Sequence, residues 1–214
     1  MKLVYSITIL LFSVQNIFFC QGLNINESGL QTFYFEDPQN RNQLLFTNDA
    51  LVESFNGITT DVWGEVSFDP ADIQNSFKGL ILTSVKSIKT GIELRDEDLY
   101  SVRWLEAEKY PEISLEIIEV AEVMRIDNNK LKLSLIGNFN LHGKTKAIML
   151  DVDLILLEES ELTKSRIQGD LLSIVSVFEI KMADFGIRNA FIPNRVSDIV
   201  KITINIVGTN KQIG

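Results

Sequence analysis

Hydrophobic and polar residues alternate with a period of two along most of the chain. The segment 130–142 places Leu131, Leu133, Leu135, Phe139 and Leu141 on one face. The segment 146–156 does the same with Ile148, Leu150, Val152, Leu154 and Leu156, and the segment 200–208 with Val200, Ile202, Ile204 and Ile206. Polar residues occupy most of the opposite faces, which is typical of half-buried strands in an antiparallel sheet.

The segments 130–142 and 146–156 together predict one tall hairpin. Gly143 lies between them as the turn residue, and strands of about 12 residues span about 40 Å. In the segment 112–120 the apolar positions change phase after Ile117, which predicts a β-bulge. Weaker alternation predicts further strands at 43–47, 61–69, 80–87 and 166–180.

One segment, at about 96–108, has a convincing helical pattern. Asp96 fits the N-cap position, Leu99, Val102 and Leu105 recur at helical spacing, and Pro111 ends the element. One short helix cannot cover a sheet of about eight strands, so the sheet must close into a barrel or fold into a sandwich. The tall strands favour an all-β barrel, whose interior is either filled by side chains or holds one small ligand.

The N-terminus has the features of a secretory signal peptide. Lys2 precedes a mostly apolar run that ends at Phe19, and Cys20 and Gly22 suit cleavage after Gly22. We therefore expect a signal peptide at 1–22, a single domain at 23–214, and a periplasmic or secreted product. A lipoprotein acylated at Cys20 is the less favoured alternative.

Composition excludes several classes of function. The formal charge of −9 and the pI of about 4.7 argue against nucleic acid and anionic membranes as partners. One histidine, and no cysteine after cleavage, argue against a zinc site and a Cys–His nucleophile. Asp151 and Asp153 lie on the polar face of a strand, where solvation is a simpler role than metal binding. We predict no catalytic residue, catalytic cofactor or metal, and a chain that is not an enzyme.

Four ordered motifs, SIKTGIELRDEDL, YPEISLEI, GNFNLHGKTKAIMLDV and FEIKMADFGI, resemble the YceI-like family over residues 31–207. The resemblance implies an extended, eight-stranded, antiparallel, lipocalin-like barrel with one short helix. It also implies a periplasmic protein that holds a polyisoprenoid or another long-chain amphiphile. The matching motif positions are Ser87, Ile88, Thr90, Gly91, Arg95, Asp96, Leu141, His142, Gly143, Thr145, Lys146, Asp184, Phe185, Gly186 and Ile187.

The chain departs from the family pattern in three places. Asp98 stands where many members have histidine, and Trp104 with Leu105 replaces a common aromatic pair. NQLLFT stands where members have a His-Ser segment before the second strand.

Two hypotheses of function follow. In the first, the lumen sequesters or carries a polyisoprenoid, an isoprenoid quinone or a fatty-acid-like amphiphile. The residues predicted to line the lumen or its mouth are Leu133, Leu135, Phe139, Leu150, Val152, Leu154, Ile202, Ile204, Trp104 and Arg95, with Arg95 meeting the head group. In the second, the lumen is filled by the chain itself, and the protein acts through its loops as an interaction or stress-response protein.

The predicted partner is a hydrophobic small molecule, with neither nucleic acid nor stable membrane insertion. Homodimerisation and a membrane redox partner stay open.

Overall fold

The structure is a computed structural model that describes Leu23 and residues 29–212 of the 214-residue chain. The predicted signal peptide at 1–22 lies outside these residues. The strands are β1 (Gln31–Tyr34), β2 (Gln43–Asp49), β3 (Ser54–Thr59), β4 (Val62–Phe68), β5 (Lys78–Ser84), β6 (Glu112–Arg125), β7 (Lys130–Leu141), β8 (Lys144–Leu157), β9 (Leu171–Lys181) and β10 (Ile199–Thr209). The α-helices are α1 (Ile73–Ser76), α2 (Glu93–Tyr100) and α3 (Glu161–Lys164). Within the described part of the chain, no helix is both long and apolar enough to cross a membrane.

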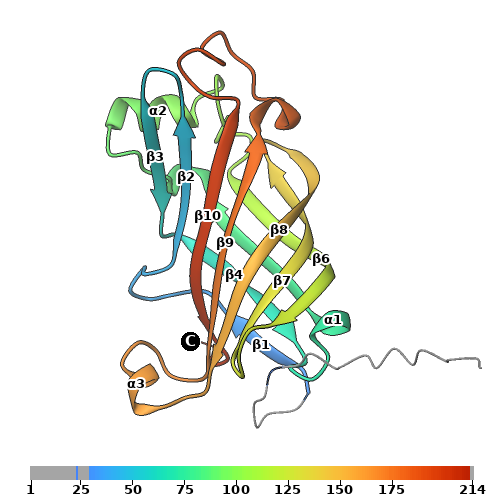
Figure 1. Ribbon diagram of the computed structural model, residues 1–214. Helices are drawn as coiled ribbons and strands as arrows, with labels where there is room; N and C mark the ends of the chain where they lie inside the picture. The colour runs from blue at the N-terminus through green and yellow to red at the C-terminus, as the bar shows by residue number, and fades with distance from the viewer. Residues whose placement is uncertain (1–22, 24–28, 213–214) are drawn as a thin grey trace, which may run out of the picture.

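Eight antiparallel strands close into a barrel, which confirms the predicted fold class. Their order is β1-β4-β5-β6-β7-β8-β9-β10, and β1 pairs with β10 to complete the circle. The hairpin of β2 and β3 is an addition to this barrel and pairs with β10 through β2. Figure 1 shows β2, β3 and α2 at one end of the barrel and β1 and α3 at the other. We call these the near end and the far end.

The tall hairpin and the bulge are both confirmed. β7 and β8 pair along their length and are joined by His142 and Gly143, whose φ values of 53° and 68° give the left-handed turn that a two-residue hairpin favours. The register of β6 against β7 shifts between Ile117 and Glu119 and again between Val120 and Glu122. The predicted strand at 166–180 starts late, because residues before Leu171 belong to a loop.

The predicted helix at 96–108 is wrong in its bounds and in its cap. α2 begins at Glu93, with Ile92 as the N-cap residue, and ends at Tyr100. Asp96 lies inside the helix, because its carboxylate caps the preceding turn instead of the helix end. Val102 is 80% exposed, so the apolar spacing after Tyr100 does not mark a packed helical face.

The far half of the lumen is filled by side chains. Phe33, Phe68 and Phe77 stack with centroid distances of 5.6 and 5.5 Å. Leu131 and Leu133 of β7 are fully buried beside these rings. This close packing agrees with the capacity of an eight-stranded barrel, whose interior side chains can fill.

Asn42 completes the barrel wall where β1 and β2 leave a gap along β10. β1 pairs with β10 at Thr209, and β2 pairs with it only up to Asn205. Between them, the backbone N–H of Val207 donates to Asn42 Oδ1 (2.8 Å), and Asn42 Nδ2 donates to the Val207 carbonyl (3.2 Å). Asn42 is 1% exposed and also donates to the Phe35 carbonyl at 2.7 Å. Its amide thus takes the place of a backbone pair that the sheet lacks.

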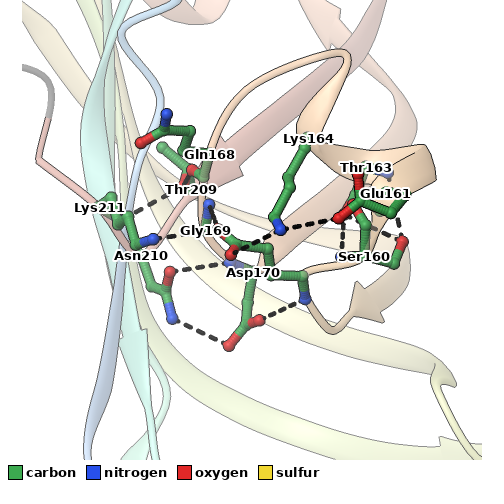
Figure 2. Close-up of polar contacts among 11 residues, drawn as sticks. Ser160, Glu161, Thr163, Lys164, Gln168, Gly169, Asp170, Thr209, Asn210 and Lys211 are labelled. Atoms are coloured by element: carbon green, nitrogen blue, oxygen red, sulfur yellow. Dashed lines mark hydrogen bonds and ion pairs between the residues drawn. The ribbon is translucent and has the colours of Figure 1, made fainter.

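A polar network fixes the loop between β8 and β9 beside the end of β10 at the far end (Figure 2). Asp170 accepts from the Glu159 N–H (2.7 Å) and from Asn210 Nδ2 (3.0 Å). The Gly169 N–H and the Lys211 ammonium hold the pKa of Glu159 below its usual range. Ser160 and Thr163 form a capping box on α3.

Asp37 links the connection between β1 and β2 to the same loop. Its carboxylate accepts two bonds from the Arg41 guanidinium (2.8 and 2.9 Å), and Arg41 also donates to the Arg166 carbonyl (2.8 Å). The Arg41 hydrogen bonds lower the pKa of Asp37 and outweigh the opposite effect of burial. The ionised form of Asp37 therefore stabilises the folded state.

Replacing Asn42 by leucine should lower the free energy of unfolding by about 2–5 kcal/mol, because two backbone groups of β10 would lose their partner in a buried place. Urea unfolding followed by circular dichroism measures this loss. Asn56→Leu, at an exposed position of β3, is the matched control and should change stability by less than about 0.5 kcal/mol. Equal stability of the two variants would show that Asn42 does not join the strands.

Asp37→Asn should cost about 1.5–3 kcal/mol at neutral pH. Since folding lowers the pKa of Asp37, this contribution is complete above the unfolded value of about 3.9 and is lost as the pH falls through the lower folded value. The stability difference between wild type and variant should therefore shrink only below about pH 4. Asp153→Asn, on an exposed face, controls for the change of net charge. A difference that stays constant down to pH 2 would contradict this role.

Candidate binding cavity

The near half of the barrel contains an apolar cavity of about 380 Å³. Its lining on five of the barrel strands includes Ile81, Leu115, Phe139, Phe178 and Ile204. The last four point inward because they occupy the apolar parity of β6, β7, β9 and β10, and Ile81 is the buried residue between Leu80 and Leu82 on β5. The volume falls within the roughly 300–1,000 Å³ of small-molecule sites.

The cavity ends where the filled half begins. On β10 the residues Val200, Ile202 and Ile204 line it, whereas Ile206, the next inward residue, is fully buried outside it. On β7 the same change occurs between Phe139, which lines the cavity, and Leu135, which does not.

The ten predicted lumen and mouth residues therefore separate into two groups. The cavity lining includes Arg95, Trp104, Phe139, Ile202 and Ile204. The filled part of the barrel interior contains Leu133, Leu135, Leu150, Val152 and Leu154, each at most 3% exposed. The second group therefore faces the lumen but lies outside the cavity lining, because parity shows which face points inward but not how far down the lumen an open space extends.

α2 lies at the rim and does not plug the lumen. Its only buried residue is Asp96, whose carboxylate accepts from the Thr90 N–H and the Thr90 hydroxyl, both at 2.7 Å. Gly91 follows with a φ of 80°, which a side chain would disfavour. Lys89 exchanges two backbone bonds of 2.8 Å with Ile58, so this motif extends the wall beyond β3.

Arg95 fastens α2 to the β2–β3 hairpin. Its guanidinium pairs with Glu53 at 2.7 Å and lies 4.6 Å above the ring of Phe55. Both partners line the mouth of the cavity. Arg95 therefore lines the cavity, and its charge already has a partner.

The other motif residues join the β7–β8 hairpin to the turn at 182–185. His142 Nδ1 lies 3.2 Å from the Phe185 carbonyl, and the His142 ring packs against Tyr110 at 4.8 Å. Phe185 packs edge-on against Phe139 at 5.7 Å. Gly186, with a φ of 79°, ends the turn, and Asp184 is exposed. These contacts give the motif a structural role at the rim.

Sequence patterns missed Phe191 and Arg195, which line the mouth from the loop between β9 and β10. That loop shows no alternation of apolar and polar residues. Only the segment FIPNR at 191–195, which combines an aromatic ring with an arginine, could have pointed to these two residues. Among the described residues, no group of three or more His, Cys, Asp or Glu side chains could hold a metal ion.

A family model described as a YceI-like domain matches residues 36–208. The chain belongs to the YceI-like family. Among curated relatives, a UPF0312 protein of Vibrio cholerae is 26% identical over 125 residues, which are 58% of this chain and 60% of that relative. The match thus spans less than two thirds of the relative's length.

Solved structures share the fold of this YceI-like chain. BcnA of Burkholderia cenocepacia has a TM-score of 0.63 and 16% identity, covering 81% of this chain and 100% of that one. A polyisoprenoid-binding domain from Saccharophagus degradans, implicated in plant cell wall breakdown, has a TM-score of 0.61 and 14% identity over 85% and 99% of the two chains. The YceI protein of Campylobacter jejuni has a TM-score of 0.58 and 22% identity over 77% and 90%. At these identities the likeness shows the fold alone.

Asp96→Ala should lower the free energy of unfolding by about 1.5–3 kcal/mol, because both groups of Thr90 lose a charged acceptor. Thermal and urea unfolding measure the change. Glu97→Ala, at the exposed neighbouring position, should have an effect below about 0.5 kcal/mol. Equal losses in the two variants would mean that the carboxylate does not organise the rim.

Proposed function

We propose that this chain binds the apolar chain of an amphiphile in the near-end cavity and carries or sequesters it reversibly. The observation that carries this proposal is the apolar space of about 380 Å³ at one end of an otherwise filled barrel. Membership of the YceI-like family and the likeness to a polyisoprenoid-binding domain support it. The ligand classes in view are a polyisoprenoid, an isoprenoid quinone and a fatty-acid-like molecule.

Burial of apolar surface supplies the affinity in this mechanism. Each CH₂ group taken from water contributes about 0.8 kcal/mol, so a chain needs few polar contacts to be held. The described lining residues include no histidine, cysteine or lysine. Binding and release, with no bond made or broken, is the activity that such a lining supports, and we propose that the chain is not an enzyme.

The proposed site of action is the periplasm or the exterior of the cell. This part of the proposal rests on the signal-like pattern at residues 1–22. A carrier there would move an apolar chain through water between surfaces. Mass spectrometry of the mature N-terminus of the secreted product would test it.

In the competing hypothesis the lumen is filled by the protein's own side chains, and the protein acts by interacting with other molecules through its loops. The packed far half, with Phe33 and Phe68 at its centre, favours it in part. The near-end cavity argues against it. Organic extraction of protein purified from its native host, followed by mass spectrometry, separates the two, because only a carrier should release a long-chain species in stoichiometric amount.

Ile204→Trp should narrow the cavity at its inner end and weaken binding of the neutral fluorescent probe N-phenyl-1-naphthylamine by at least about tenfold, because the indole takes space that the aromatic rings of the probe need. Asn205→Trp adds the same ring at the adjacent exposed position and should leave binding unchanged. Circular dichroism checks that both variants fold. Unchanged binding in a folded Ile204→Trp variant would place the probe elsewhere and contradict the proposal.

A further inference from the structure

We infer that the preferred ligand is a single-chain anionic amphiphile of about a dozen carbons whose head group contacts Arg195. This inference rests on the proposed function and narrows it to fatty-acid-like molecules. It combines the size of the cavity with the pairing of the charges at its mouth.

The depth of the cavity limits the length of chain that it can enclose. The lining of β10 runs from Val200 to Ile204. This is a distance of roughly 13 Å, close to the extended length of a chain of about a dozen carbons.

The close-packed far half of the barrel closes the inner end of the cavity. Phe33, Leu133 and Ile206 are at most 1% exposed, and close-packed interiors resist the insertion of extra methylene groups. A longer chain would leave its remaining carbons in water at the mouth. Such carbons add no burial, so affinity should stop rising once the cavity is full.

The charges on the lining point to an anionic head group. Four charged residues line the cavity, and three of them already have partners. Arg95 pairs with Glu53 at 2.7 Å, and Asp98 pairs with Arg103. No carboxylate of the described residues pairs with the fourth, Arg195, whose guanidinium lies 5.7 Å from the ring centre of Phe191. The backbone N–H of Arg195 donates to the Phe191 carbonyl at 2.8 Å, which holds the two side chains on one turn of the loop.

The site for the head group and the site for the tail are thus placed so that one molecule can occupy both. Arg195 lies at the mouth and the apolar walls lie behind it, so a carboxylate can meet the guanidinium while its chain enters the barrel. A guanidinium also offers two parallel donors to a carboxylate. The pairing of the charges at the rim therefore assigns the head group to Arg195 in place of Arg95.

Titration calorimetry with saturated carboxylates of 8 to 18 carbons, kept below micelle formation, tests the length limit. The dissociation constant should fall about fourfold per added methylene and level off near 12 carbons. A constant that keeps falling to 18 carbons would overturn the limit. Absence of binding by every carboxylate and by dodecanol would overturn the proposed function itself, which is a distinct result.

Arg195→Ala tests the head-group assignment with dodecanoate and dodecanol as paired ligands. The variant should bind dodecanoate about tenfold more weakly and dodecanol as wild type does. Arg188→Ala, an exposed arginine of the same loop that does not line the cavity, should bind both ligands as wild type does. Equal weakening for both ligands, or no change for either, would overturn the assignment.

Discussion

The side chain of Asn42 holds the barrel wall together where two strands fail to meet. β10 pairs with β9 along its whole length, but its other edge is shared between β1 at the far end and β2 at the near end. The amide of Asn42 bonds both backbone groups of Val207 in the interval between them. Without this bridge the sheet would have an unpaired edge inside the wall of the barrel.

This shared edge also divides the lumen into two halves of different character. β1 brings Phe33 to the far half, where it stacks on Phe68 and fills the space. The β2–β3 hairpin forms the wall of the near half, where Gly57 faces the ring of Phe46 so closely that a Cβ would lie 2.1 Å from it. At Gly57, β3 therefore has no side chain that could enter the near half, and α2 lies at the rim. The near half stays open for these two reasons, and this open space is the cavity.

The alternation of apolar and polar residues predicted which side chains face the lumen. It could not predict at which depth the lumen changes from packed core to open cavity. Alternation placed Leu133 and Ile204 correctly on the inner face, and Gly143 marked the turn of the tall hairpin. It could not show that Leu133 lies in packed core while Ile204 borders open space, because the residues filling the far half come from distant segments such as β1 and β4. Asp96 was misplaced as an N-cap because Thr90, its true partner, precedes the helix. Arg195 lies in a loop without periodicity, so only the structure brings it to the mouth.

Xenon-pressurised crystals of the protein without ligand would measure the division of the lumen most directly, since xenon enters dry apolar cavities and not close-packed cores. Xenon should bind between Leu115, Phe139 and Ile204, and no xenon should bind beside Phe33 and Phe68. Xenon throughout the lumen, or none at the near end, would contradict a barrel with one open and one filled half.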